Sequence, residues 1–199
     1  MQLLEDIDTY LLYAVNSGME NRFFDVLMPF VTNYRNWYFI ILAVMAIMII
    51  RDWKKGLMTI LLVMAAVSIS DYLNSHVVKF MFGRARPCSA LPTETLRLIL
   101  GCPSNPSFPS SHASNIFALT VVLVYRYRVL LIYMLTIAVL VCLSRVYLAV
   151  HYPSDVIAGG IFGILYGSMV ILIYNRITGI YKENKNLNTN STNGTNYTK

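Results

Sequence analysis

The sequence VLLIYMLTIAVLVCLSRVYLAVHYPSD, residues 129–155, joins an apolar run to a polar cluster. The run Val129–Tyr147 is long enough to cross a membrane, because roughly 30 Å of hydrocarbon takes about 20 helical residues. Ser144 and Arg145 lie near its end, and His151 and Asp155 follow shortly after it. This stretch therefore predicts a transmembrane helix that carries reactive side chains to one membrane face.

Four further apolar stretches lie along the chain, at Asn36–Ile50, Gly56–Phe82, Ala113–Tyr125 and Ser154–Tyr174. The second is longer than a bilayer requires, so we expect its Lys79 end at the interface. The first and third are short, and we expect them to extend into their polar flanks or to lie among longer neighbours. The pattern predicts an all-α integral membrane protein with a bundle of five or six transmembrane helices.

The composition agrees with this class of protein. Of the 199 residues, 56% are hydrophobic and 13% are charged, whereas a soluble domain carries about 25% charged residues. The net charge of +6 does not indicate nucleic-acid binding, because the 16 Lys and Arg residues are scattered among short loops rather than clustered with aromatic residues. An anionic phosphate substrate explains the charge better.

The two ends of the chain differ from its core, residues 36–181. Residues 1–35 place apolar side chains at helical spacing with acidic ones between them. This favours an N-terminal amphipathic, interfacial helical segment over a re-entrant hairpin or a sixth, broken span. Residues 182–199 are mainly Asn, Thr, Ser and Lys without an apolar period, which predicts a disordered polar tail.

The distribution of basic residues predicts the orientation in the membrane. With five spans, nine basic residues lie on one face and seven on the other, and three of the seven have a chemical role argued below. Nine against the remaining four places the first face in the cytoplasm by the positive-inside rule. We expect a multi-pass protein of the cell (inner) membrane, with residues 83–112 facing the periplasm or outside and the C-terminal tail in the cytoplasm.

Three polar clusters interrupt the apolar pattern, and this topology brings them to the same face. They are Lys79 to Arg86-Pro87, then Pro109-Ser110-Ser111-His112, then Ser144-Arg145 with His151 and Asp155. The first and third supply three cations, Lys79, Arg86 and Arg145. An unpaired charge at mid-bilayer costs roughly 2.5–3.5 kcal/mol, so three of them indicate a clamp for an anionic phosphate.

The other residues of the clusters fit phosphoryl transfer. Ser110 and Ser111 begin a helix, where free N–H groups and the helix dipole favour an anion. Asp155 follows His151 by one helical turn and can accept its Nδ1 proton, which leaves Nε2 as a nucleophile. His112 can protonate the leaving alkoxide and later activate water. One such residue alone would be more often a membrane anchor, so the prediction depends on the three clusters together.

These clusters resemble the signature of the type 2 phosphatidic acid phosphatase superfamily, the lipid phosphate phosphatases. That signature is Lys-x6-Arg-Pro, Pro-Ser-Gly-His and Ser-Arg-x5-His-x3-Asp, and this chain departs from it only in Ser111, where Gly is usual. The resemblance covers about residues 71–155. It implies that His151 forms a phosphohistidine, Asp155 orients it, and His112 is the general acid. It also implies that Lys79, Arg86, Ser110, Ser111 and Arg145 bind phosphate, and that the chemistry needs no metal.

Several other residues have a possible supporting role. Asp71 lies in the second apolar stretch, where it is expected to orient the helix or a basic residue. Arg84 is expected either to contact anionic groups of the substrate or to be solvated, and Arg97 has the same two options. Cys88 and Cys102 face an oxidising space in this topology, so they form a disulfide or stay free with equal weight.

The sequence therefore predicts a membrane lipid phosphatase without a cofactor. The candidate substrates are undecaprenyl pyrophosphate, phosphatidylglycerophosphate, phosphatidic acid and the 1-phosphate of lipid A. A lipid-to-lipid phosphotransferase with the same site is the nearest alternative, and an anion channel or membrane scaffold is the non-enzymatic one. The expected partners are the lipid phosphate substrate and membrane lipids, with no nucleic acid and no obligate protein partner.

Overall fold

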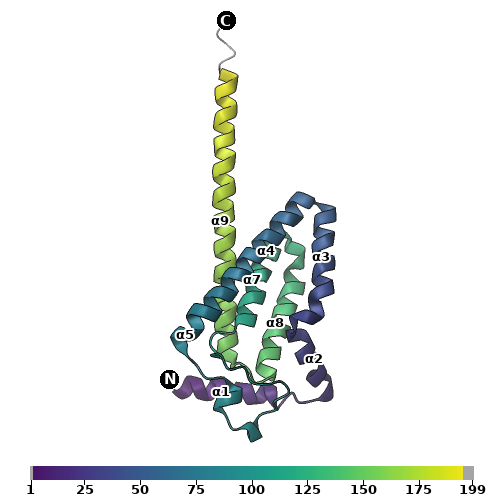
Figure 1. The fold of residues 1–199 in the computed structure, drawn as a ribbon, viewed down its shortest axis with the longest axis vertical. Helices are drawn as coiled ribbons and strands as arrows, with labels where there is room; N and C mark the ends of the chain where they lie inside the picture. The colour runs from purple at the N-terminus through teal and green to yellow at the C-terminus, as the bar shows by residue number, and fades with distance from the viewer. Residues whose placement is uncertain (1, 195–199) are drawn as a thin grey trace.

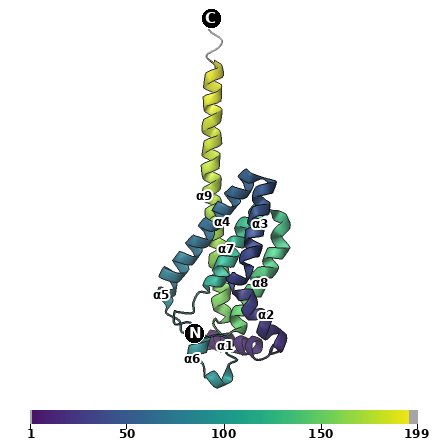
Figure 2. The same cartoon turned by 45° about the vertical axis from the view of Figure 1, so that its right-hand side comes forward.

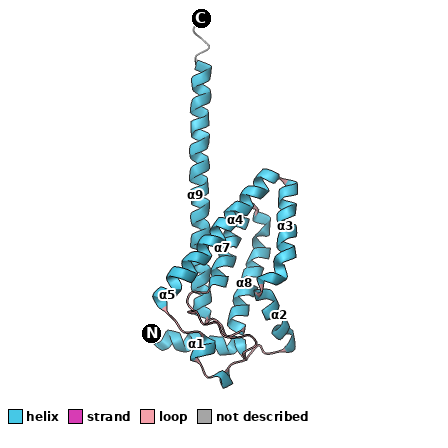
Figure 3. Cartoon of the chain, viewed as in Figure 1, coloured by secondary structure: helices cyan, strands magenta, loops and turns pink. Residues whose placement is uncertain are grey.

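The computed structural model describes the backbone of residues 2–194 and the side chains of residues 3–181. Every regular element in this part of the chain is a helix (Figure 3). Four helical stretches are long and apolar enough to cross a bilayer, namely Tyr34–Arg51, Trp53–Ala90, Arg128–Tyr147 and Pro153–Tyr181. The predicted class of all-α integral membrane protein is thereby confirmed.

The core is a bundle of five helices that run side by side (Figures 1 and 2). They are α3 (Tyr38–Arg51), α4 (Trp53–Leu73), α7 (Ser111–Arg126), α8 (Leu131–Tyr147) and α9 (Pro153–Gly194). α4 continues through a π-helical turn, Asn74–Val78, into α5, Lys79–Phe82. α7 is only 16 residues long and packs against α4, α8 and α9. Each of the five apolar stretches in the sequence is therefore a helix, and the short third one is surrounded by longer neighbours.

The contact between α7 and α9 depends on glycine. Gly159, Gly163 and Gly167 of α9 lie along the face that meets α7. A side chain at Gly163 would collide with the backbone of Ser114 and Ala118, so the two helices approach more closely than larger residues permit. This close packing places the first turns of α7 and α9 next to each other, where the amide N–H of Ser110 donates to the carbonyl oxygen of Asp155 at 2.9 Å.

The N-terminal helices lie at one end of the bundle. α1, Gln2–Asn16, lies across this end of the bundle (Figures 1 and 2). α2, Arg22–Thr32, packs against α8 and leads through a 3₁₀ turn, Tyr34–Trp37, into α3. With 11 residues α2 is too short to span. The interfacial location of residues 1–35 stays a prediction.

The long connection between α5 and α7 lies at the same end as α1 (Figure 2). It contains α6, Pro87–Ala90, and a 3₁₀ turn at Thr93–Thr95. A 3₁₀ turn at Arg128–Leu130 joins α7 to α8 at the opposite end. At that opposite end the backbone of α9 continues as a helix to Gly194, although the composition predicts a disordered tail from Lys182. Residues 195–199 of that tail lie outside the described residues.

Candidate active site

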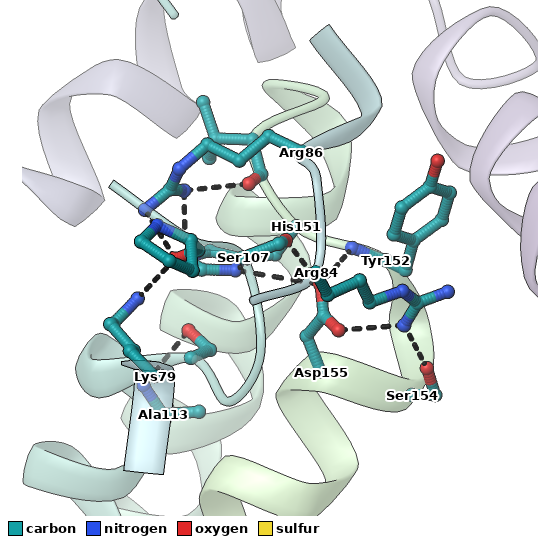
Figure 4. Close-up of polar contacts among 12 residues, drawn as sticks. Lys79, Arg84, Arg86, Ser107, Ala113, His151, Tyr152, Ser154 and Asp155 are labelled. Atoms are coloured by element: carbon teal, nitrogen blue, oxygen red, sulfur yellow. Dashed lines mark hydrogen bonds and ion pairs between the residues drawn. The ribbon is translucent and has the colours of Figure 1, made fainter. Parts of the chain in front are cut away.

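The three polar clusters meet at the end of the bundle that α1 covers. Each comes from the end of a different helix. Lys79 begins α5, Arg86 precedes α6, Ser110 caps α7, Arg145 lies in the last turn of α8, and Asp155 lies in the first turn of α9. Figure 4 shows Lys79, Arg86, His151 and Asp155 around one small volume. The structure therefore brings together residues that the sequence separates by up to 76 positions.

His151 is held between two groups. Its exposed fraction is 1%. Nη1 of Arg86 lies 3.2 Å from Nε2, and Oγ of Ser107 lies 3.3 Å from Nδ1. Because a guanidinium can only donate hydrogen bonds, Nε2 must be the acceptor and Nδ1 must carry the proton. The tautomer required of a nucleophilic Nε2 is therefore the one that the surroundings select.

The charge state of His151 follows from its burial. Desolvation, with smaller contributions from the charges of Arg86 and Arg145, lowers the pKa of His151 to about 3 against the opposing effect of Asp155. The imidazole is therefore neutral at any physiological pH. A neutral ring keeps the Nε2 lone pair available for attack.

The side chain of Asp155 is fully buried, and both of its carboxylate oxygens accept hydrogen bonds. Oδ2 accepts from the hydroxyl of Ser107 at 2.5 Å and from the amide N–H of Tyr152 at 2.9 Å. Oδ1 accepts from Nη1 of Arg84 at 2.7 Å. The Nδ1 atom of His151 is 3.6 Å from Oδ2 of Asp155. The sequence predicts a direct hydrogen bond between these two residues, whereas in the structure the hydroxyl of Ser107 lies between them.

The three cations are buried but face no carboxylate. Lys79, Arg86 and Arg145 have exposed fractions of 2%, 4% and 8%. Nζ of Lys79 donates to the carbonyl oxygen of Pro106 at 2.8 Å. Arg86 donates to the carbonyl oxygen of Val150 at 2.7 Å and also to Asn105. None of the three cations forms an ion pair with any side chain that the structure describes.

Arg145 is the least satisfied of these cations. Its Nη1 donates to the hydroxyl of Thr32 in α2 at 2.8 Å, and its buried Nε has no partner among the described residues. A buried N–H of a charged group without an acceptor is costly, unless a ligand satisfies it. Three buried positive charges with donors to spare form a site for an anion.

The start of α7 completes the site. Ser110 is fully buried, and its side chain caps the helix by accepting from the amide N–H of Ala113. Ser111 and His112 form the first turn, whose N–H groups have no carbonyl partner within the helix. Ser111 is half-buried and His112 is exposed. The first turn of α7 therefore offers both N–H donors and an imidazole next to the cations.

The other predicted residues have partners within the protein. Arg84 forms ion pairs with Asp8 and Asp155, and Arg97 pairs with Glu20 and Asp25, so neither is simply solvated. Asp71 accepts from the side-chain amide of Asn115 at 2.9 Å, which ties α4 to α7. Cys88 and Cys102 form a disulfide across the long connection.

A small polar pocket lies beside Arg86. It has a volume of about 360 Å³ and is lined by residues 83–86, Ser89 and 102–106. The disulfide forms part of its wall through Cys102. Of the residues predicted to bind phosphate, Arg86 lines this pocket.

Sequence reasoning missed several residues that hold the site. They are Asp8, Thr32, Asn105, Ser107, Tyr152 and Ser154. Most are single polar residues outside any motif, and their partners are up to 146 positions away. Asp8 alone carried a signal, because it shares an i, i+4 spacing with Leu12 and Asn16 on one side of α1.

Comparison with known proteins agrees with the geometry. The model of the PAP2 superfamily matches residues 56–178. A lipid A 4'-phosphatase of Bacteroides thetaiotaomicron is 29% identical over 89% of this chain and 81% of its own length. An undecaprenyl-diphosphatase of Sulfolobus acidocaldarius is 31% identical over 69% of this chain and 64% of its own length.

A solved structure is also similar. The PAP2 type phosphatidylglycerolphosphate phosphatase from Bacillus subtilis superposes with a TM-score of 0.67 at 26% identity. The alignment covers 89% of each chain. The likeness thus extends beyond the motif-bearing helices to most of the bundle.

Proposed function

This chain belongs to the PAP2 superfamily, and from that premise we propose that it hydrolyses a lipid phosphomonoester or pyrophosphate through a phosphohistidine at His151. It is a membrane enzyme, a phosphatase of lipid phosphates. The observation that carries the proposal is the group of three buried cations, Lys79, Arg86 and Arg145, that face no carboxylate among the described residues. Their charge is balanced when a phosphate lies between them.

The first step is attack by His151 on phosphorus. The Nε2–P bond forms as the bond from phosphorus to the lipid oxygen breaks. His112 takes up a proton once the bound phosphate balances the charges of Lys79, Arg86 and Arg145, and it gives this proton to the departing oxygen. The cations stabilise the charge that spreads over the phosphoryl oxygens. Asp155 and Ser107 hold the Nδ1 proton and so stabilise the ring while Nε2 is phosphorylated.

The second step returns the enzyme to its starting state. His112, now neutral, removes a proton from a water molecule, whose oxygen attacks phosphorus. The Nε2–P bond breaks, inorganic phosphate leaves, and His151 is neutral again. No step requires a metal, because the charge stabilisation comes from Lys79, Arg86, Arg145 and the N–H groups at the start of α7.

The substrate enters from the membrane, and we place the site on the outer side. The disulfide Cys88–Cys102 supports this side, because disulfides persist in oxidising compartments. The excess of basic residues at the opposite end of the bundle supports it too. A membrane-impermeant thiol reagent, applied to intact cells after mild reduction, should label Cys88 and Cys102. Labelling that occurs only after cell lysis would show that the site faces the cytoplasm instead.

The test of the proposed function is release of inorganic phosphate by the detergent-purified protein from a panel of lipid phosphates. The panel holds undecaprenyl pyrophosphate, phosphatidylglycerophosphate, phosphatidic acid and lipid A carrying its phosphates. We expect release without any acceptor lipid, undiminished by EDTA and abolished by His151→Ala. Activity lost to EDTA would overturn the metal-independent mechanism, and turnover by His151→Ala would overturn the phosphohistidine. A requirement for an acceptor lipid would identify a phosphotransferase instead.

A further inference from the structure

Helix α1 buries two polar side chains, Asp8 and Asn16, against the protein on either side of the apolar Leu12. Asp8, Leu12 and Asn16 follow one another at intervals of four residues and are all buried, with exposed fractions of 5%, 0% and 0%. Leu3, Leu4 and Tyr10 are 72–73% exposed. Asp8 is the one buried carboxylate among the described residues of α1, so the bundle must supply its partners.

Both oxygens of Asp8 are bound by the active-site end of the chain. Oδ1 accepts from the amide N–H of Ser154 at 2.8 Å, and Oδ2 accepts from Nη2 of Arg84 at 2.7 Å. The hydroxyl of Ser154 donates to the same carboxylate. Asp8 therefore binds the first turn of α9 as a capping residue would, although it comes from a helix 146 positions earlier.

Arg84 connects Asp8 to the centre of the site. Its Nη1 donates to Oδ1 of Asp155 at 2.7 Å, while its Nη2 is held by Asp8. The guanidinium also lies over the ring of Tyr152, with 4.0 Å between Cζ and the ring centroid. The planar fork thus has a carboxylate on each side, and Figure 4 shows Arg84 between Asp155 and Ser154.

We propose that Asp8 is a positioning residue of the active site, which fixes Asp155 through Arg84 and makes α1 part of the catalytic machinery. The inference rests on the proposed function, because it assigns Asp155 the role of orienting His151. Without Asp8, Nη2 of Arg84 loses its carboxylate partner, and the guanidinium is free to rotate about its side-chain bonds. Asp155 then loses the fixed donor on Oδ1, and with it part of the alignment of Ser107 and His151.

The charge of Asp8 matters as much as its geometry. Arg84 adds a fourth cation to an end of the bundle that already holds Lys79, Arg86 and Arg145. With Asp8 and Asp155 on either side, Arg84 is neutralised within its own group. Asp8 thereby shares the compensation of the Arg84 charge, which would otherwise fall on Asp155 alone.

The experiment compares Asp8→Asn with Asp6→Asn, the same substitution at an exposed position of the same helix. Both are assayed for phosphate release in detergent, per mole of folded monomer. Asp8→Asn should lower kcat about 10- to 100-fold with KM within about twofold, because it removes one charged hydrogen-bond network and no substrate contact. Asp6→Asn should match the wild type. Asp8→Glu, which keeps the charge, should restore more of kcat than Asn does.

A second measurement separates positioning from a general loss of structure. If Asp8 acts through Arg84, the double variant Asp8→Asn with Arg84→Ala should be no slower than Arg84→Ala alone. Multiplication of the two effects would overturn the proposal, as would an unchanged kcat in Asp8→Asn or no rescue by Glu.

If Asp8→Asn does not fold, Ser154→Ala takes its place. It removes one donor to Asp8 and should lower kcat about threefold, and a wild-type kcat there would overturn the proposal. The outcomes also distinguish this inference from the proposed function. An inactive wild type on every lipid refutes the phosphatase proposal, whereas an active wild type with unaffected Asp8 variants refutes only the role of α1.

Discussion

The hydroxyl of Ser107 donates to Oδ2 of Asp155 at 2.5 Å and lies 3.3 Å from Nδ1 of His151. Ser107 therefore lies between His151, the proposed nucleophile, and Asp155, the carboxylate proposed to orient it. The direct distance from His151 to Asp155, 3.6 Å, is too long for a good hydrogen bond. The orienting group of this site is a pair, Ser107 with Asp155, rather than a carboxylate alone.

Replacing Ser107 by Ala should therefore slow the chemistry. A hydrogen bond to a charged group contributes about 1.5–3 kcal/mol, which corresponds to a fall in kcat of about 10- to 100-fold. KM should stay within about twofold, because Ser107 is fully buried behind His151. Phosphate release by purified protein measures both constants. The control is Thr93→Ala on the exposed surface of the same connection, and an equal loss in both variants would contradict a role for Ser107.

The lowered pKa of His151 predicts a pH dependence of stability. Its ordinary pKa near 6.5 falls to about 3 in the folded protein, so the unfolded chain binds a proton first as the pH decreases. Above pH 6.5 His151 is neutral in both the folded and the unfolded chain, so it does not change the free energy of unfolding. As the pH falls from about 6.5 toward 3, only the unfolded chain takes up the proton, and the free energy of unfolding decreases. Between pH 6.5 and 5 the loss is on the order of 2 kcal/mol.

Thermal unfolding in detergent measures this effect. The variant His151→Gln does not titrate, so its Tm should fall less steeply between pH 7 and 5 than that of the wild type. The difference should be a few degrees, at about 2–4 °C per kcal/mol for a chain of this size. Parallel curves for the two proteins would show that His151 is not the titrating group.

The close contact of α7 with α9 predicts a strong effect at one glycine and none at another. Gly163→Leu places a side chain against the backbone of Ser114 and Ala118, so α7 must move and the first turn that holds Ser110 moves with it. We expect a lower Tm and a kcat reduced at least about tenfold. Gly179→Leu on the same helix meets nothing within 4 Å and should leave both unchanged. Equal effects would refute the packing argument.

The disulfide predicts a dependence of stability on reductant. Cys88 and Cys102 are separated by 14 positions, and closing a loop of that size stabilises a protein by about 3 kcal/mol in the chain-entropy model. The double variant Cys88→Ser with Cys102→Ser should therefore melt at a lower temperature than the wild type, and reductant should lower the wild-type Tm to the same value. Cys142→Ser, at the free cysteine, should keep the wild-type response to reductant. A wild-type Tm that reductant does not change would contradict the bond.

The sequence by itself determined the helices and the end of the bundle at which the three polar clusters meet. Apolar run length is a local property, so Gly56–Phe82 and Val129–Tyr147 were recognisable as spans without knowledge of their neighbours. The residues of the three clusters were recognisable too, since three cations, two histidines and a carboxylate fall together on one face of the predicted topology. The PAP2 resemblance and the all-α membrane class were confirmed on this basis.

Only the tertiary structure decided which side chains hold the nucleophile in place. Ser107 and Asp8 carry no motif, and their partners at His151 and Ser154 lie 44 and 146 positions away. The same holds for Arg84, which was expected to meet substrate or solvent and instead lies between two carboxylates. Helix α1 buries the polar Asp8 and Asn16 beside Leu12 and exposes Leu3 and Leu4, so the polarity of a residue alone did not predict which side of this helix meets the protein. The packing of the helix ends decides which polar groups meet. This packing depends on contacts between residues far apart in the chain, so the local sequence does not determine it.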